Sequence, residues 1–321
     1  MYRNLSTQAL GFSAPQNEQI EMALSYGFRG MDLDLLDYAQ QVEARGEKMA
    51  RRLIDSAEIQ MGCFRLPVDL EADETKFKGQ VARLGGAVQY AAQLGIMVGQ
   101  TFIQPATNEL PMHENFERHR TRLAEVGQVL GTAGLRLAVG YNAVASARQG
   151  KTFEFIHTFD ALSKLLDAVG SPHVGHNLDL WQNYICSAGV DQWQHLGAEK
   201  IVAVRVSNAP ANVAAAQLED QHRLIPTLDG PVPLLEGINA LKAMEYAGPV
   251  TPVVHRSVFS GKRRDEVVRV VGRAMSELWH EAELGPLLSV GGVEPTGNGE
   301  QEAPEEATAE QNRQPEESQT S

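Results

Sequence analysis

Residues 173–182 read HVGHNLDLWQ, and this stretch indicates how the whole chain is folded. A short apolar-leaning run leads into Asp179, residues 152–169 before it have helical spacing, and a further helix is predicted from Asp191. The stretch therefore predicts a β-strand between two helices, with a carboxylate at its C-terminal end. In barrels built from alternating strands and helices, the chemistry is located at that end of the strands.

The same alternation of a short β-like run and an amphipathic helix repeats along the chain. Eight strands are predicted, at residues 5–10, 30–35, 59–67, 97–105, 135–143, 173–179, 201–209 and 249–256. Eight helices are predicted, at residues 17–26, 39–58, 74–94, 113–130, 153–169, 191–200, 234–246 and 264–284. This repetition predicts an α/β fold of the (β/α)₈ TIM barrel type.

An open, doubly wound sheet is the alternative architecture. We favour the barrel because no GxGxxG follows the first predicted strand and the helices are almost evenly spaced. Pro252 argues against the eighth strand as drawn, because a proline in the middle of a strand removes a hydrogen-bond donor from the ladder.

The C-terminal end differs in composition from the rest of the chain. From residue 291 onward it has eight Glu and one Arg, so it carries −7 of the net charge of −13, and Val293 is its only large apolar residue. Such a segment cannot bury enough apolar surface to offset the entropy lost on ordering. We therefore divide the chain into a barrel domain at residues 1–287 and a disordered, Glu/Gln/Pro-rich tail at residues 288–321.

Composition also limits the compartment and the partners. The start of the chain, MYRNLSTQALGF, lacks the apolar core of a signal peptide, and no apolar run is long enough to span a membrane. Cys63 and Cys186 lie far apart without CxxC spacing, which favours a reducing cytoplasm over a disulfide framework or a zinc site. The sequence has no basic stripe with interleaved aromatic residues, and this argues against nucleic-acid binding. The sequence leaves open whether the protein forms a homo-oligomer.

The alternation of side chains along each strand predicts which polar residues face the barrel lumen. In the stretch 173–182, Asn177 and Asp179 are predicted to point inward and His176 toward the helices. The other polar residues predicted to point inward or to lie at the mouth are Asp32, Asp34, Arg65, Gln100, Gln104, Asn142, Arg205, Ser207 and His255.

With these features in place, the chain resembles the xylose isomerase-like TIM barrels, and more narrowly the sugar phosphate isomerase/epimerase group. The similarity lies in the strand order, in GFRGMDLDL at residues 27–35, in the strand that ends at Asp179, and in YAGPVTPVV at residues 246–254. It covers roughly residues 1–285. It implies a role in carbohydrate metabolism, with a small polyhydroxylated or sugar-acid substrate bound at the C-terminal mouth of the barrel, and typically one divalent metal such as Mn²⁺ or Mg²⁺.

The metal site implied by this resemblance is degenerate. Of four expected ligands only Asp179 is present, and the expected Glu, His and Glu fall at Gly140, Arg205 and Val253. The His expected three residues after Asp179 is Gln182. We therefore predict no metal and no other cofactor, the alternative being Mn²⁺ or Mg²⁺ in a site rebuilt around Asp179. Our hypothesis is that Arg205 stands where the metal stood and forms a bidentate ion pair with Asp179.

Three residues are candidates for catalytic groups: Asp179, His255 and Arg205. Each also has a second interpretation. Asp179 would be a relic held by Arg205, Arg205 would be a structural partner or an anchor for a phosphate or carboxylate, and His255 would be merely hydrogen-bonded. The residues that we predict to bind substrate are Asp32, Asp34, Arg65, Gln104, Asn142, Asn208 and Arg223.

Asp32 and Asp34 share one strand face. They are either a pair of carboxylates for proton transfer, or one binds a substrate hydroxyl while the other caps or pairs. Asn208 stands where an Asp often follows the seventh strand in the resembling family. Arg223 belongs to a long loop, residues 210–233, and the resemblance implies that this loop closes over the substrate, because the family has an Arg and a Gly-rich segment at this place.

Two functions stay open. The first is an isomerase- or epimerase-like enzyme that works without the family metal. The second is a catalytically inactive barrel that binds a metabolite or a protein partner, which the loss of three of four ligand positions favours. A DNA-repair endonuclease would need several metals and a basic groove, and the sequence predicts neither.

Overall fold

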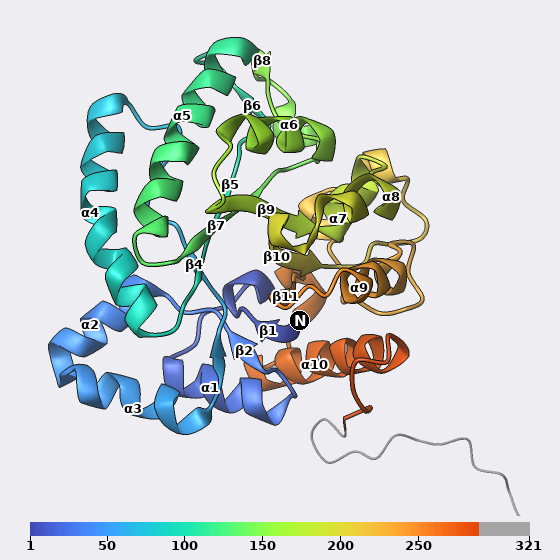
Figure 1. Ribbon diagram of the computed structural model, residues 1–321. Coiled ribbons are helices and arrows are strands. Elements are labelled where there is room, and N and C mark those ends of the chain that lie inside the picture. Colours follow the sequence, from blue (N-terminus) through green and yellow to red (C-terminus); the bar gives the residue numbers. More distant parts are fainter. Residues whose placement is uncertain (289–321) are drawn as a thin grey trace, which may run out of the picture.

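Parallel strands run through the centre of residues 1–288, the part of the chain that this computed structural model describes (Figure 1). Their order is β3-β2-β1-β11-β10-β9-β7-β5-β4. The strands are β1 (Tyr2–Leu5), β2 (Gly30–Met31), β3 (Gln60–Met61), β4 (Cys63–Arg65), β5 (Val98–Phe102), β7 (Arg136–Gly140), β9 (Val174–Asp179), β10 (Ile201–Val206) and β11 (Pro249–Pro252). The predicted acidic tail lies outside the described residues, apart from Leu288.

The two ends of this strand order meet, because β3 and β4 are separated only by Gly62 and form one interrupted strand. The sheet therefore closes into a barrel of eight strand positions. The predicted TIM barrel is confirmed, and the open, doubly wound alternative is wrong. A separate antiparallel pair, β6 (Ala106–Thr107) with β8 (Phe153–Glu154), joins the connections that follow β5 and β7.

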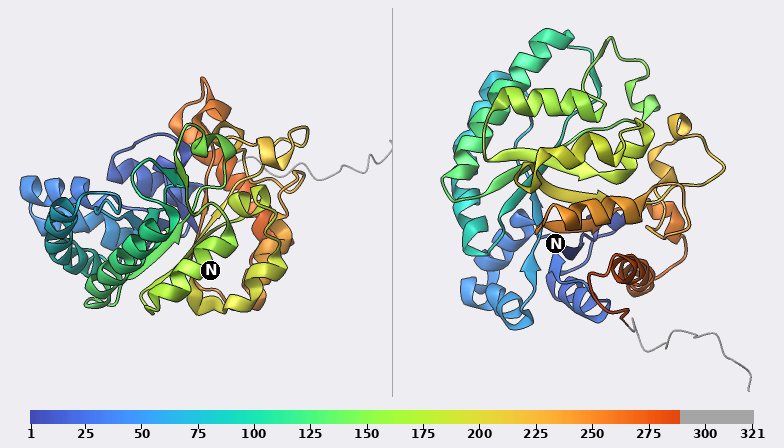
Figure 2. Two further views of the ribbon diagram at one scale, coloured as in Figure 1. Left: turned by 90° about the horizontal axis from the view of Figure 1, so that it is seen from above. Right: turned by 45° about the vertical axis from the view of Figure 1, so that its right-hand side comes forward.

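Helices form an outer layer around the strands (Figures 1 and 2). They are α1 (Gln16–Ser25), α2 (Leu35–Arg45), α3 (Glu47–Ala57), α4 (Glu74–Gln93), α5 (Met112–Gly131), α6 (Phe159–Val169), α7 (Leu180–Ile185), α8 (Val190–Trp193), α9 (Leu234–Ala243) and α10 (Arg264–Glu281). Neighbours along this layer contact one another, for example α4 with α5, α5 with α6, and α10 with α1. None of the helices described is long and apolar enough to cross a membrane.

Two predicted helices are wrong in extent, each for a local reason. The helix predicted at residues 39–58 is two helices, because Gly46 has φ 80° and interrupts the run between α2 and α3. The helix predicted from Phe153 begins only at Phe159. Thr158 caps it by accepting a hydrogen bond from the Ala161 N–H, while residues 153–154 are extended in β8.

The segment predicted as a helix at residues 191–200 is also broken. It consists of α8 and two short 3₁₀ helices, and Gly197, with φ 81°, separates the latter. The first strand was placed too late, since Tyr2–Leu5 form β1 and Gln8–Leu10 form a 3₁₀ helix that ends at Gly11. These segments are short, so periodicity over them discriminates weakly between structures.

Pro252 ends the last strand, in agreement with the objection to a strand through residue 256. It is the last residue of β11 and pairs in register with Val206 of β10. The next residue, Val253, still donates its N–H to the Val206 carbonyl at 2.9 Å. The chain then turns into a 3₁₀ helix at Arg256–Phe259, which places His255 at the mouth.

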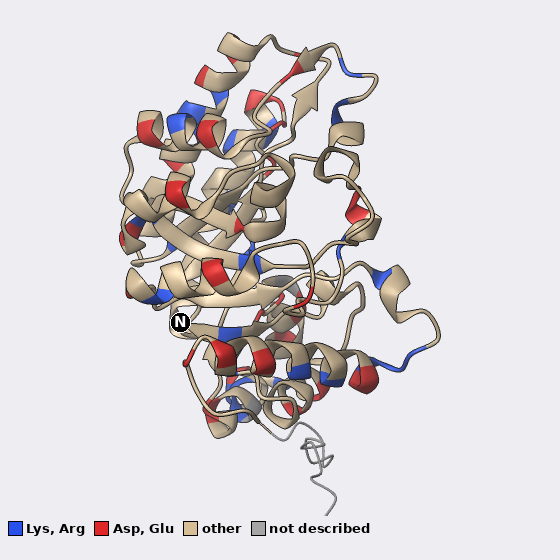
Figure 3. Cartoon of the chain, turned by 90° about the vertical axis from the view of Figure 1, so that its right-hand side faces the viewer, with Lys and Arg blue, Asp and Glu red and all other residues tan. Residues whose placement is uncertain are grey.

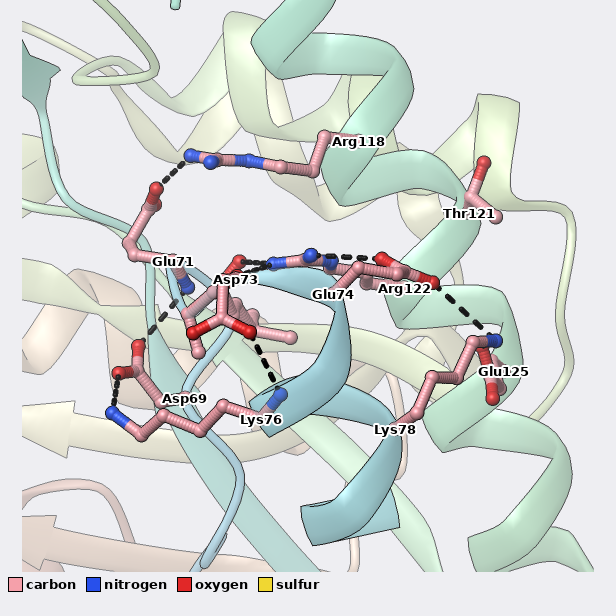
Figure 4. Close-up of polar contacts among 12 residues, drawn as sticks. Asp69, Glu71, Asp73, Glu74, Lys76, Lys78, Arg118, Thr121, Arg122 and Glu125 are labelled. Carbon is pink, nitrogen blue, oxygen red and sulfur yellow. Dashed lines mark hydrogen bonds and ion pairs between the residues drawn. The ribbon is translucent and has the colours of Figure 1, made fainter. Parts of the chain in front are cut away.

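The connection from β4 to α4 is fastened to α5 by a buried arginine (Figure 4). The guanidinium of Arg122 donates to the carbonyls of Leu70 and Ala72, at 2.9 and 2.6 Å. It also pairs with Glu74 at 3.0 Å and lies over the Phe77 ring, 4.4 Å from its centroid. Because these contacts satisfy carbonyls that no ladder reaches, they hold this loop in place at the C-terminal side of the barrel.

Charged residues outside the barrel follow no single sign. On the side of the molecule drawn in Figure 3, acidic and basic residues are interspersed along the helices. Cys63 and Cys186 are both free. A small buried cluster separate from the main core contains Cys63, Ala138, Val202 and Ala203.

Candidate active site

Asp179 is the last residue of β9 and also the N-cap of α7. Its Oδ1 accepts hydrogen bonds from the backbone N–H groups of Trp181 and Gln182, at 3.1 and 3.3 Å. These contacts turn the carboxylate toward the first turn of the helix. The side chain is buried, with 3% of its surface exposed, so its charge needs a close partner.

That partner is Arg223, from the loop that precedes α9. Its guanidinium makes a bidentate pair with Asp179, with nitrogen–oxygen distances of 2.9 and 3.3 Å. It also donates to Ser207 Oγ at 3.2 Å and lies over the Trp181 ring, 4.2 Å from its centroid. The bidentate guanidinium pair predicted for Asp179 therefore exists, but another arginine supplies it.

The hypothesis that Arg205 pairs with Asp179 is wrong. Arg205 and Asp179 are register partners on the adjacent strands β10 and β9. The Arg205 guanidinium nevertheless lies over the Phe102 ring, 4.7 Å from its centroid. Within residues 1–288 it has no hydrogen bond or ion pair. Since the cap directs the Asp179 carboxylate away toward α7, a loop arginine reaches it and the strand neighbour does not.

The loop is held so that Arg223 can make this pair. Leu224 and Asn208 form an antiparallel bridge, with their N–H···O distances at 3.1 and 2.8 Å. The Arg223 carbonyl accepts the N–H of His255 at 3.0 Å. Asn208, predicted to bind substrate, is buried, donates to the Thr227 carbonyl at 2.7 Å and accepts from Val232 N–H at 3.2 Å. Its side chain is therefore engaged in shaping the loop.

Asp32 lies in the lumen within a chain of polar contacts. Its Oδ1 accepts from Asn4 Nδ2 and from the Cys63 N–H, both at 2.7 Å, and Gln100 Nε2 approaches Oδ2 at 3.5 Å. Asn177 Nδ2 donates to Gln100 Oε1 at 3.4 Å, so the inward positions predicted for Asn177 and Gln100 are confirmed. Burial raises the pKa of Asp32, against the opposing effect of its hydrogen bonds and of the Arg205 charge.

A cavity of about 380 Å³ opens at the C-terminal mouth of the barrel. Five of the predicted site residues are among those that line it, namely Gln104, Asn142, Arg205, Arg223 and His255. Its wall also contains Gln8, Phe102, Tyr141, Gln182, Asp220 and Arg256, which the sequence reasoning did not select. Phe102 could have been found, since it has the same strand parity as Gln100.

The remaining predicted residues lie elsewhere. Asp34 is exposed and accepts hydrogen bonds from the Asp37 N–H at 3.2 Å and from Gln8 Nε2 at 3.5 Å, so it caps the first turn of α2. Arg65 is exposed at the end of β4. Neither residue lines the mouth cavity.

His255 is held by its own turn. Its Nδ1 accepts the Ser257 N–H at 3.3 Å and lies 2.8 Å from Ser257 Oγ. With Nδ1 acting as an acceptor, the neutral ring carries its proton on Nε2. His176, by contrast, stacks on Phe159 of α6 at a centroid distance of 5.1 Å, which confirms the prediction that it faces the helices.

A larger cavity of about 690 Å³ lies at the opposite end of the barrel, where its lining includes Tyr2 and Pro249 at the starts of β1 and β11. We place the site at the smaller mouth cavity, because the C-terminal strand ends of such barrels carry the chemistry. The mouth also collects the polar residues of several strands.

The residues at the mouth do not fit the divalent metal implied by the family resemblance. Within residues 1–288, no group of three or more His, Cys, Asp or Glu side chains is arranged to hold a metal ion. Asp179, the one matching ligand, already has a cation as its partner. A second cation beside Arg223 would be repelled.

Comparison with known proteins agrees with this architecture. No curated protein matches the chain. Among solved structures, a xylose isomerase domain protein from Alicyclobacillus acidocaldarius subsp. acidocaldarius is similar, with TM-score 0.79, 22% identity and coverage of 88% of this chain and 99% of that one. A D-psicose 3-epimerase from Clostridium cellulolyticum H10 has TM-score 0.68, 13% identity and coverage of 88% and 99%.

The IolI protein, solved with a bound zinc atom, has TM-score 0.73, 12% identity and coverage of 87% of this chain and 98% of that one. At these identities the likeness shows the fold. The family model described as xylose isomerase-like TIM barrel matches residues 20–270, which is most of the chain. The chain therefore belongs to the xylose isomerase-like TIM barrel family.

Proposed function

We propose that the mouth cavity binds a small polyhydroxylated or sugar-acid substrate, and that the bound substrate undergoes isomerase- or epimerase-type proton transfer without a divalent metal. The family membership and the sugar epimerases among the structural neighbours support the substrate class. The observation that carries the metal-free part is the bidentate pair between Arg223 and Asp179. It places a permanent guanidinium charge at the one carboxylate left from the family's ligand set.

The available groups suggest how such a reaction would be divided among them. The oxygens of Asp179 are already engaged in this arrangement, because Arg223 and two backbone N–H groups donate hydrogen bonds to them. His255 lines the cavity and is the remaining predicted acid or base there. Arg205, also in the wall, would supply positive charge to the anionic part of the substrate, whether a developing enediolate oxygen or a fixed anionic group.

One observation favours the second candidate, a catalytically inactive barrel that binds a metabolite or partner. Of the three residues proposed as catalytic groups, Asp179 is buried and does not line the cavity. An enzyme that used all three would need them to converge on one point. The proposed experiment therefore measures binding and proton transfer separately.

The experiment uses full-length protein treated with a chelator. Calorimetry with a panel of pentoses, hexoses and their acids identifies ligands, and NMR in D₂O follows deuterium incorporation at the carbon next to the carbonyl of each ligand. We expect exchange that survives EDTA and is lost in His255→Ala, while Ser257→Ala keeps it. Binding without exchange would support the inactive barrel, and exchange that requires added Mn²⁺ or Mg²⁺ would refute the metal-free mechanism.

A further inference from the structure

Arg205 is the feature of the mouth that neither the fold nor the Asp179 pair explains. Its side chain is half-buried at the end of β10 and lines the cavity, yet within residues 1–288 its guanidinium has no hydrogen bond or ion pair. Removing a charge from water without a partner costs free energy. Burial lowers the pKa of Arg205, in line with that cost.

The nearby carboxylates do not serve as its partners. Asp179 is engaged by Arg223 and by the N-terminus of α7. Asp32 is engaged by Asn4 and by the backbone N–H of Cys63. Each carboxylate therefore has its own donors, and the in-plane N–H groups of Arg205 are left over.

Phe102 is the aromatic side chain that the Arg205 guanidinium contacts. The Arg205 guanidinium lies over the Phe102 ring, and the same ring also covers Gly140, where an added Cβ would come 2.6 Å from a ring carbon. An aromatic ring does not use up the hydrogen-bond donors of a guanidinium as a carboxylate would, so the N–H edge of Arg205 stays available. That edge matches the two oxygens of a carboxylate or phosphate.

A second arginine extends the positive wall. Arg256 also lines the cavity, and its side chain has no ion pair among the described residues. The carboxylate in the wall, Asp220, lies 3.6 Å from Arg223 Nε. The cavity thus offers two uncommitted guanidinium groups to a ligand, and the more buried of them is Arg205.

We propose that Arg205 anchors an anionic group of the substrate, so that the substrate class is a sugar acid or sugar phosphate and not a neutral sugar. This rests on the proposed function, because it assumes that the mouth cavity is where the polyhydroxylated ligand binds. Carboxylate and phosphate share the fork geometry. The cavity volume of about 380 Å³ limits either ligand to a small metabolite.

The test compares matched ligands that differ only in charge: D-glucose, D-glucuronate and D-glucose 6-phosphate, with the galactose and mannose series alongside. Calorimetry measures Kd for wild type, Arg205→Gln, Arg205→Lys and the matched control Arg269→Gln, which changes an exposed arginine of α10 that does not line the cavity. We expect an anionic member of some series to bind wild type at least about tenfold more tightly than its neutral parent, as a charged hydrogen bond to a carboxylate or phosphate would give.

The variants locate the effect. Arg205→Gln should abolish the preference for the anion, Arg205→Lys should keep part of it, and the surface control Arg269→Gln should leave the ratio unchanged. Because Arg205 has no hydrogen bond or ion pair to lose within residues 1–288, we expect Arg205→Gln to fold with an unchanged or higher Tm. Should it fail to fold, competition of 50 mM sulfate, used as a probe anion, against the bound ligand on wild type provides the second measurement, and anchoring by Arg205 requires that sulfate weakens binding.

The outcomes separate the two proposals. Equal binding of neutral and anionic partners to wild type, or a preference that survives in Arg205→Gln, overturns the anionic anchor while the proposed function stands. Binding of no member of any series, with or without Mn²⁺, means that the proposed function itself fails. A preference for the phosphate over the carboxylate, lost in Arg205→Gln, would assign the anion to a sugar phosphate.

Discussion

Replacing Arg223 with Met should destabilise the barrel strongly, because it leaves Asp179 as an unpaired buried carboxylate. The two side chains are 7% and 3% exposed, so water does not replace the lost partner. Removing one member of such a pair typically costs about 3–5 kcal/mol. Asp179 keeps its two hydrogen bonds from the N-terminus of α7, so we expect a loss near the lower end, about 3 kcal/mol.

The assay is urea unfolding followed by circular dichroism, for wild type, Arg223→Met, Asp179→Asn and the double variant. The double variant should be less destabilised than the sum of the single ones, with a coupling free energy of about 2 kcal/mol. Arg256→Met, an exposed arginine on the same cavity wall, is the matched control and should change stability by less than about 0.5 kcal/mol.

The reasoning is refuted if Arg223→Met costs less than about 1 kcal/mol or if the coupling is near zero, since either result would mean that the pair is not the partner Asp179 requires. A larger loss for Arg205→Met than for Arg223→Met would restore the hypothesis that the strand arginine neutralises Asp179.

Three further predictions concern the frame of the barrel. Arg122→Leu leaves the carbonyls of the β4–α4 connection without donors and should lower the unfolding free energy by about 3–5 kcal/mol in urea titrations; a loss below about 1 kcal/mol would contradict the clamp. Burial lowers the pKa of His176 to about 4, whereas the unfolded-state pKa is about 6.5, so between these two pH values the unfolded chain binds a proton that the folded chain does not. The free energy of unfolding should therefore fall by up to about 3 kcal/mol as the pH drops from about 6.5 to about 4. In His176→Phe the free energy of unfolding should depend less on pH in this range. Gly62→Ala places a Cβ 2.6 Å from Asp32 Oδ1 at the junction of β3 and β4, so thermal unfolding should show a loss of about 1–3 kcal/mol, whereas Gly79→Ala, with open space around it, should not destabilise.

The barrel itself could be predicted from the sequence because its signal is repeated. Each unit contributes only a short apolar run and an amphipathic helix, but eight in succession leave few other architectures. The helix boundaries within a unit depend on single residues such as Gly46 and Thr158. The periodicity of apolar residues does not reveal the effect of such a residue. That is why three predicted helices were wrong in extent or broken while the fold was right.

The site was predictable to the extent that strand parity determines it. Parity placed Asn177 and Gln100 in the lumen and His176 against α6, as observed. It also placed Arg205 beside Asp179, and the strand register agrees. The alternation of side chains between the two faces of a strand does not predict which neighbour a long side chain contacts. The Asp179 carboxylate turns to cap α7, and its partner comes from a loop whose path depends on a bridge between Asn208 and Leu224, a contact that no local pattern signals.

The Arg223 pair also makes a prediction about metals that is independent of activity. A divalent cation could reach Asp179 only after Arg223 leaves, and a displacement cost of about 3 kcal/mol would weaken its apparent affinity by about a hundredfold. Within residues 1–288 no group of three or more His, Cys, Asp or Glu side chains is arranged to hold a metal ion, and Asp179 by itself offers too few ligands for tight binding of Mn²⁺. Calorimetric titration of Mn²⁺ into chelator-treated protein should therefore show no stoichiometric micromolar binding, either to wild type or to Arg223→Met. Binding of Mn²⁺ to Arg223→Met but not to wild type would mean that the guanidinium fills a latent metal site. Binding to wild type that is lost in Asp179→Ala would mean that the proposal of a metal-free site at the barrel mouth is wrong.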